Sequence, residues 1–160
     1  MRTLIIKTSS LGDVLHTLPA VSDAAAQHPG MRFDWVVEEA FAEVPGWHAA
    51  VDEVIPVALR RWRHRPFHVL RLGAPQAAMR QIRQREYDQV IDAQGLMQSA
   101  VMTRLARGPR TGLDRHSARE SLAASACDRR IPVARNQHAV TRVRQLFAAA
   151  LDNPLPNTRA

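Results

Sequence analysis

Residues 2–13 read RTLIIKTSSLGD, and this stretch decides the fold that we predict. Its first half is a short apolar run rich in β-branched residues, which is typical of a buried strand. Its second half, from Thr8 to Asp13, carries turn and helix-cap residues. Apolar residues at helical spacing follow from Val14 to Ala25, and His28-Pro-Gly30 is a helix stop signal. The stretch therefore predicts a strand, a loop and a helix in direct succession.

The same succession recurs along the chain. We expect further strands at 32–37, 51–57, 87–91 and 110–113, and helices at 39–44, 76–85, 96–106, 119–126 and 138–151. The start of 60–75 reads as irregular because of its arginines, Pro66, Gly73 and Pro75. This alternation predicts an α/β fold, a Rossmann-like, doubly wound, mainly parallel sheet with the strand ending at Lys7 near its centre. We expect one domain over 1–151 and a linker-like tail over 152–160.

The composition fits a folded domain. Of 160 residues, 46% are hydrophobic and 23% are charged, which is ordinary for a globular protein and argues against disorder. No apolar run approaches the ~20 residues that cross a bilayer, and the N-terminus lacks the pattern of a secretory signal. The single cysteine, Cys127, cannot form an internal disulfide, which fits a reducing cytosol. No Cys/His cluster has metal-ligand spacing, so we expect no metal and no cofactor.

The net charge of +7 is concentrated in one region. Residues 60–85 hold eight arginines and no acid. The guanidinium fork suits phosphate and carboxylate groups, so Arg60, Arg61 and Arg63 are candidates for binding an anionic ligand. The alternative is a solvated basic face attracted to anionic lipid headgroups. Arginines 80, 83 and 85 fall on a predicted helix and are expected to form its solvent side.

The loop from Thr8 to Asp13 is the main candidate site, because ligands of open α/β sheets bind beyond the carboxyl ends of strands. It carries neither the G-x-G-x-x-G dinucleotide fingerprint nor a P-loop. From spacing alone Asp13 is more often a helix cap than a catalytic group, and both roles stay open. The loop residues Ser9, Ser10 and Gln94 suit hydrogen bonds to a sugar or ordinary turn roles. His16, one helical turn after Asp13, either orients that carboxylate or is a histidine at the core rim.

Several stretches of the sequence resemble a known family. Lys7-Thr-Ser-Ser-Leu-Gly-Asp-Val-Leu-His-Thr-Leu-Pro-Ala20 is similar to the opening signature of the bacterial heptosyltransferases. Seven further blocks resemble those of the heptosyltransferase I group in the same order, up to about residue 150: Trp35-Val-Val-Glu-Glu39, Trp47-His-Ala-Ala-Val51, Val54-Ile-Pro-Val57, Arg60-Arg-Trp-Arg63, Ile91-Asp-Ala-Gln-Gly-Leu96, Ala118-Arg-Glu120 and Gln137-His-Ala-Val140. Several collinear blocks make the resemblance specific.

The resemblance implies a glycosyltransferase of the two-domain GT-B type. The family moves L-glycero-D-manno-heptose from ADP-heptose to the 3-deoxy-D-manno-octulosonic acid (Kdo) of the lipopolysaccharide inner core, with inversion. Its N-terminal domain receives the acceptor, Kdo-lipid A, and its C-terminal domain holds the nucleotide sugar. The present chain resembles the N-terminal half. We therefore expect the second domain to be absent from it, and we expect no turnover from this chain alone.

The resemblance also assigns roles to residues. It implies that Asp13 is the general base, since an inverting displacement needs one base for the acceptor hydroxyl. The acceptor-binding residues that it implies are Ser9, Ser10, Gly12, Arg60, Arg61, Arg63, Gln94 and Arg119. The family pattern often has a lysine where this chain has Gln98, which puts a charge role at that position in doubt.

The partners implied are Kdo-lipid A, ADP-heptose through the missing domain, and the anionic cytoplasmic face of the inner membrane. The rival interpretation is a non-catalytic basic module that binds a lipid surface or nucleic acid. We expect no nucleic-acid partner, because no such motif is present and aromatic residues make up only 5% of the chain.

Overall fold

The computed structural model describes residues 1–65, 67, 71 and 73–155. Its strands are β1 (Arg2–Ile6), β2 (Arg32–Glu38), β3 (Val51–Val57), β4 (Gln89–Asp92), β5 (Arg110–Leu113) and β6 (Arg129–Ile131). Its α-helices are α1 (Leu11–Leu15), α2 (Leu18–Gln27), α3 (Leu59–His64), α5 (Ala74–Arg83), α6 (Met97–Leu105) and α7 (Ala139–Ala150). Short 3₁₀ helices are η1 (Glu39–Phe41), η2 (Pro45–Trp47) and η3 (Ser121–Ala126).

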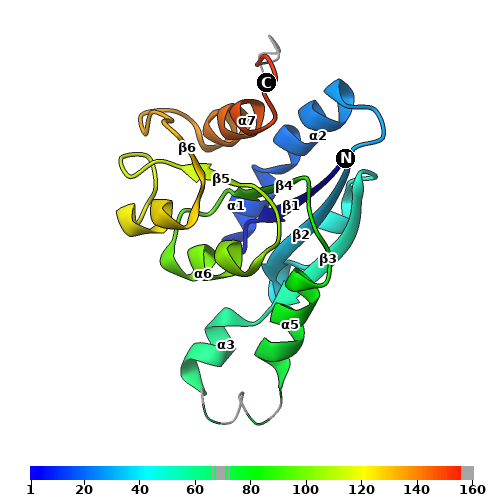
Figure 1. Cartoon of the computed structure of the whole chain (residues 1–160), viewed down its shortest axis with the longest axis vertical. Coiled ribbons are helices and arrows are strands. Elements are labelled where there is room, and N and C mark those ends of the chain that lie inside the picture. The colour runs from blue at the N-terminus through cyan, green and yellow to red at the C-terminus, as the bar shows by residue number, and fades with distance from the viewer. Residues whose placement is uncertain (66, 68–70, 72, 156–160) are drawn as a thin grey trace.

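The six strands form one sheet in the order β3-β2-β1-β4-β5-β6, and every neighbouring pair is parallel. β1 lies between β2 and β4, near the centre. Helices cover both faces, with α2 and α7 on one face and α5 and α6 on the other (Figure 1). The predicted α/β class, the parallel sheet and the central position of the first strand are confirmed.

The side chains of β1 alternate between two hydrophobic cores. Ile5 packs with Trp35 and with residues of α2 and α7, whereas Leu4 and Ile6 pack with Val36 and with residues of α5 and α6. This alternation follows from the two-residue period of a strand. The three apolar side chains of β1 named here and their partners Trp35 and Val36 are fully buried, as expected for a parallel sheet that is covered on both faces.

The structure corrects the prediction for the arginine-rich segment. Its first part is not irregular, because Leu59–His64 forms α3. The amide of Leu59 donates to Oε2 of Glu38 (3.2 Å), and Trp62 packs against the core that contains Leu4 and Ile6. These tertiary contacts favour a helical turn that the local sequence does not indicate. Pro66, 68–70 and Leu72 lie outside the described residues.

The helix expected after Asp13 is divided in two. α1 ends at Leu15, and α2 begins at Leu18 with Pro19 in its first turn, where a missing N–H is tolerated. The hydroxyl of Thr17 donates to the Asp13 carbonyl (2.9 Å) at the junction. As a result Asp13 is carried by a separate five-residue helix. The sequence analysis also missed β6, which is short and mostly exposed.

The end of the domain reaches slightly past α7. Asp152 forms an ion pair with Arg129 (2.9 Å), and the Asn153 side chain is hydrogen-bonded to His28 (2.7 Å). These two residues are therefore held against the domain. Residues 156–160 lie outside the described residues, so the linker-like tail stays a prediction.

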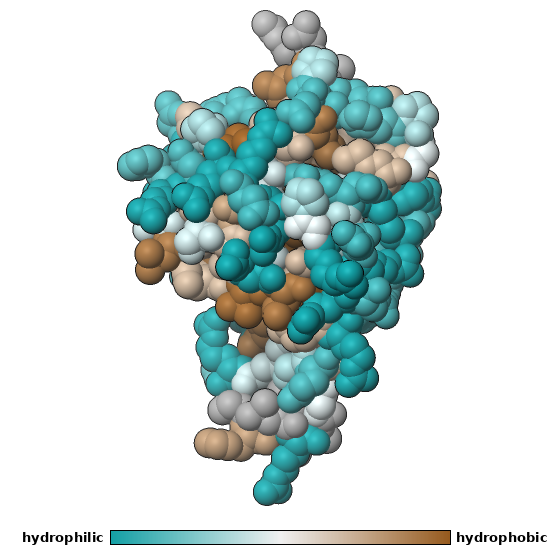
Figure 2. All heavy atoms as spheres, viewed as in Figure 1, coloured by the Kyte–Doolittle hydropathy of each residue, from teal (hydrophilic) through white to brown (hydrophobic). Residues whose placement is uncertain are grey.

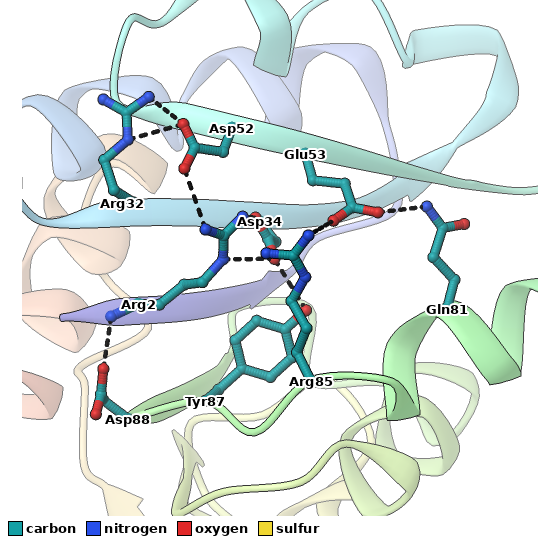
Figure 3. Close-up of polar contacts among 9 residues, drawn as sticks. All are labelled: Arg2, Arg32, Asp34, Asp52, Glu53, Gln81, Arg85, Tyr87 and Asp88. Atoms are coloured by element: carbon teal, nitrogen blue, oxygen red, sulfur yellow. Dashed lines mark hydrogen bonds and ion pairs between the residues drawn. The ribbon is translucent and has the colours of Figure 1, made fainter.

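A polar network ties together the amino ends of the central strands (Figure 3). Asp34 of β2 is fully buried and accepts two hydrogen bonds from the Arg2 guanidinium (2.6 and 3.0 Å) and one from the Tyr87 hydroxyl (3.0 Å). Asp52 bridges Arg2 and Arg32 on the same side. Because each buried charge has an opposite partner, this network is structural.

The Tyr87 hydroxyl should contribute measurably to stability. Tyr87→Phe leaves a buried carboxylate oxygen with one donor fewer, so we expect the free energy of unfolding to fall by about 1–3 kcal/mol in urea titrations. Arg107→Ala is the control, since its ion pair with Glu86 (3.8 Å) joins two exposed side chains and should contribute about 0–1 kcal/mol. Equal effects of the two substitutions would contradict the structural role of the network.

Candidate active site

Two loops meet at the carboxyl edge of the sheet. One runs from Lys7 to Ser10 after β1, and the other from Ala93 to Leu96 after β4. The Lys7 ammonium donates to the Ala93 carbonyl (3.0 Å), and the indole of Trp35 donates to the Lys7 carbonyl (3.0 Å). The parallel pairing of β1 with β4 thus delivers both loops to one place.

Gln94 joins the two loops through its side chain. Its carbonyl oxygen accepts from the amides of Thr8 (3.1 Å) and Ser9 (3.4 Å). The second loop is fixed in turn by Asp92, whose Oδ1 accepts from the amides of Gln94 and Gly95 (both 3.0 Å). Burial raises the pKa of the Asp92 carboxyl, against the effect of these hydrogen bonds. Both side chains therefore fix the shape of the loops.

Asp13 is placed by a local cap. It is the third residue of α1, and its Oδ2 accepts from the backbone amide (3.1 Å) and the hydroxyl (3.3 Å) of the N-cap residue Ser10. The guanidinium of Arg119 lies 3.8 Å from the same oxygen. No donor among the described residues bonds Oδ1. One carboxylate oxygen is thus used by the cap, and the other is available to a ligand.

On one side of this loop lies a cavity of about 80 Å³, which we call the Asp13 pocket. Its polar lining consists of Lys7, Asp13, His16, Gln94, Ser117, Arg119 and Arg142. Lys7 is buried, and that burial lowers its pKa, with Arg119 and Arg142 acting in the same direction and Asp13 opposing them. The pocket combines one carboxylate with several cations.

On the other side lies a larger cavity of about 270 Å³, the Ser10 pocket. It is lined by Thr8, Ser9, Ser10, Glu38, Phe41, Leu59, Arg60, Arg63 and Gln98. Burial raises the pKa of Glu38, although the amides of Arg60 and Leu59 donate to it. The buried Thr8 hydroxyl has no hydrogen-bond partner in the described part of the chain. Hydroxyls and guanidinium groups together suit a ligand with both hydroxyl and anionic groups.

The structure gathers most of the predicted site residues into these two pockets. Asp13, Gln94 and Arg119 line the first, and Ser9, Ser10, Arg60 and Arg63 line the second. Two predicted residues are not in the lining of either. Arg61 instead pairs with Glu39 (3.1 Å), and Gly12 lies inside α1.

Gln98 stands where the resembled family often has a lysine, and it contacts a predicted site residue. Its side-chain oxygen accepts from the Arg63 guanidinium (2.9 Å) in the Ser10 pocket. A lysine at this position would be repelled by Arg63 and would lack the acceptor. Gln98 therefore positions a cation instead of supplying one.

Sequence reasoning did not single out Lys7, Ser117 or Arg142, which line the Asp13 pocket. Lys7 follows β1 directly and is the only lysine of the chain, so its place at the carboxyl edge was a usable signal. Arg142 comes from α7, and only the tertiary packing of that helix brings it to the pocket.

The sequence comparisons name the family. The family model "Glycosyltransferase family 9 (heptosyltransferase)" matches residues 76–160, which is more than half of the chain. The chain belongs to glycosyltransferase family 9.

Individual relatives agree with this family 9 assignment. The chain is 58% identical over 159 residues to lipopolysaccharide heptosyltransferase 1 of Pseudomonas aeruginosa, covering 99% of the chain and 45% of that protein. It is 55% identical over 161 residues to the protein of the same name from Escherichia coli strain K12, covering 99% of the chain and 50% of that protein. The chain spans about half the length of the curated relatives that it matches.

A solved structure gives the same result for the fold. The E. coli heptosyltransferase WaaC, solved with ADP-2-deoxy-2-fluoro heptose, superimposes with a TM-score of 0.96 at 52% sequence identity. The match covers 99% of this family 9 chain and 51% of that structure. In the described part of the chain, no helix is long and apolar enough to cross a membrane, and no cluster of metal-binding side chains occurs.

The raised pKa of the buried Asp92 should make the free energy of unfolding depend on pH. Because burial raises its pKa, the folded chain holds this proton more tightly than the unfolded chain does. The free energy of unfolding should therefore decrease as pH rises from about 3.9 through the raised pKa. Asp92→Asn removes this titration, so the stability of the variant relative to the parent should increase over that window and then level off. Urea unfolding of both proteins from acid to neutral pH measures the difference.

Asp114 provides a control of opposite sign. Its pKa is lowered, first by the hydrogen bond from the Ser117 side chain, so its contribution to stability is lost as pH falls through the lowered pKa. Asp114→Asn should consequently lose stability relative to the parent as pH rises. A pH-independent difference for Asp92→Asn would show that Asp92 is charged equally in both states.

Proposed function

We propose that this chain is the acceptor-binding half of an inverting heptosyltransferase that transfers L-glycero-D-manno-heptose from ADP-heptose to Kdo of Kdo-lipid A. The observation that carries the proposal is the Asp13 carboxylate, which is fixed by its own helix cap, flanked by Arg119 and left with one open oxygen in a cationic pocket. The names of the relatives and the sugar nucleotide in the WaaC structure support the reaction class.

The reaction needs a single displacement. The acceptor hydroxyl attacks the anomeric carbon of the donor while Oδ1 of Asp13 takes the hydroxyl proton. The bond between the anomeric carbon and the diphosphate oxygen breaks, and ADP leaves with that electron pair. The new glycosidic bond forms on the opposite face of the sugar, which gives inversion. The residues of this chain supply the base and the acceptor site.

In this proposal, residues 1–151 form the acceptor-binding domain, and a second nucleotide-sugar domain completes the cleft. The 51% coverage of the WaaC structure supports this division. The 160-residue chain by itself should bind acceptor weakly and should not turn over. All groups that would hold ADP-heptose belong to the other domain.

The acceptor also suits the two pockets. Kdo-lipid A carries hydroxyls, carboxylates and phosphates, and the Ser10 pocket offers Ser9, Ser10, Arg60 and Arg63 at its wall. The Asp13 pocket lies on the other side of the same loop. A ligand that spans the loop would place a hydroxyl at Asp13 and anionic groups at the arginines.

The proposal includes contact with the anionic cytoplasmic face of the inner membrane, where a lipid-linked acceptor resides. An apolar groove lies between α6 and η3, and Met97, Val101 and Leu122 on these elements are 45%, 54% and 64% exposed. Figure 2 shows a mostly hydrophilic face with a hydrophobic patch at the level of α6. Arg104 in the groove and the nearby Arg63 add positive charge, which suits anionic headgroups.

Asp13→Asn should separate catalysis from capping. The amide oxygen of asparagine can still accept from the Ser10 amide, whereas its NH₂ group cannot take a proton. In an enzyme in which residues 1–151 are joined to the second half of the P. aeruginosa relative, we expect kcat to fall by about 10²–10⁴-fold. The melting temperature of the same variant should change little.

Asp13→Ala is the matched control, since it removes the cap and the base together. It should lower both kcat and the melting temperature, the latter by the equivalent of about 1 kcal/mol. Near-normal turnover in Asp13→Asn with a clear loss of stability would identify Asp13 as a cap only, and another group would then be the base.

The arginines of α3 should differ in their effects. Arg60 and Arg63 line the Ser10 pocket, so the double alanine variant should weaken binding of Kdo-lipid A nearly as much as the triple variant that also includes Arg61. Arg61→Ala alone should have a small effect, because its partner is Glu39. The loss should shrink as salt rises, and donor affinity should not change. Unchanged acceptor affinity in the triple variant would make these arginines a solvated face.

A further inference from the structure

Arg142 has unused hydrogen-bonding capacity at the wall of the Asp13 pocket. Its Nη2 donates to the Ser117 carbonyl (2.8 Å), and its Nε is buried without a hydrogen-bond partner in the described part of the chain. No described carboxylate forms an ion pair with it. Arg142 as a whole is only partly buried, but a guanidinium whose Nε is buried and that faces no anion is unusual, because burial of an unpaired charge is costly.

The surroundings of Arg142 add to this excess of positive charge. Arg119 and Lys7 line the same pocket. The pKa of Arg142 is lowered mainly by its burial and, next, by the positive charge of Arg135. Asp13 is the one carboxylate in the lining, and it is already engaged by Ser10 and Arg119. Asp92 is not in the lining of this pocket, and its carboxylate accepts hydrogen bonds from the amides of Gln94 and Gly95. The pocket therefore favours one further anionic group.

The size of the pocket limits what this group can be. About 80 Å³ is well below the ~300–1,000 Å³ of a site that encloses a whole small molecule. The pocket can receive one substituent of a larger ligand whose remainder lies outside. A carboxylate matches the guanidinium fork through two parallel hydrogen bonds. The adjoining position of Asp13 means that this ligand also presents a group to the open Oδ1.

We propose that Arg142, assisted by Lys7, binds the carboxylate of the acceptor sugar and so holds the acceptor hydroxyl at Asp13. This inference rests on the proposed function, since it takes the acceptor to be a sugar acid. Arg142 is then a positioning residue: it does not touch the reacting atoms, and it sets the orientation in which the hydroxyl reaches the base. Arg60 and Arg63 would serve the anionic groups on the other side of the loop.

The test uses the 160-residue chain and two ligands that differ in one group. The methyl glycoside of Kdo carries the carboxylate, and its carboxyl-reduced counterpart carries an alcohol there. Binding is followed by calorimetry and by the NMR signal of the Arg142 Nε–H group in ¹⁵N-labelled protein. We expect the carboxylate ligand to shift this signal and to bind about 10–100-fold more tightly than the alcohol.

Variants then locate the preference. Arg142→Gln should abolish the difference between the two ligands, and Arg142→Lys should restore part of it. Arg80→Gln, an exposed arginine of α5 outside both pockets, should leave it unchanged. The comparison of two ligands on one variant does not depend on how much of that variant is folded.

The outcomes separate this inference from the proposed function. If the Kdo glycoside binds and Arg142→Gln keeps the full carboxylate preference, the acceptor assignment stands and the role of Arg142 is overturned. If the glycoside does not bind but lactate shifts the Arg142 signal, the carboxylate site stands and the acceptor assignment fails. If inorganic phosphate shifts that signal while both carboxylates do not, the pocket is a phosphate site and the inference is overturned. Silence with every ligand overturns it as well.

Discussion

The side chain of Gln94 holds the site together, because its oxygen accepts two amides from the loop after β1 while its own backbone is fixed by Asp92. Parallel pairing brings the ends of β1 and β4 to one edge, but it does not fix the conformation of the loops that follow. The hydrogen bonds of Gln94, together with the Lys7 bond to Ala93, supply that constraint. The position of α1, and with it Asp13, depends on this junction.

The balance of charged side chains differs between the amino edge of the sheet, where the strands begin, and the carboxyl edge, where they end. At the amino edge, Asp34 and Asp52 are matched by Arg2 and Arg32, so the buried network is close to neutral (Figure 3). At the carboxyl edge the cations of the Asp13 pocket outnumber its single carboxylate. A neutral network stabilises a fold without inviting a ligand, whereas an excess of one sign favours a partner of the opposite sign. The contrast explains why only the second edge is a candidate site.

The fold was predictable because apolar periodicity and cap residues act locally. The strand before Lys7, the strand at 51–57 and the final helix all occur close to their predicted bounds. α3 was not predictable, since its helical turn depends on a hydrogen bond to Glu38 and on the packing of Trp62 against a core formed by distant strands. β6 was missed for a related reason. Three mostly exposed residues give no periodic signal, and only pairing with β5 makes them a strand.

The candidate site was predictable in part, because local sequence patterns give the order of strands, loops and helices. Asp13, Ser9 and Ser10 belong to one loop whose place at a strand end follows from the order of elements. Arg142 lies on the last helix, and its approach to Asp13 depends on how α7 packs beside α2, which no local pattern encodes.

Asp13 shows how a structural role and a chemical role can share one side chain. From the sequence alone, helix capping and catalysis are alternative roles for the Asp13 carboxylate. In the structure Oδ2 closes the cap with Ser10, and Oδ1 carries no bond from the described residues. The cap restricts the carboxylate to one orientation, so that the open oxygen is already aimed before a ligand arrives, and less conformational entropy is lost on binding. A proposed base on a five-residue helix needs this restraint, because so short a helix has little rigidity of its own.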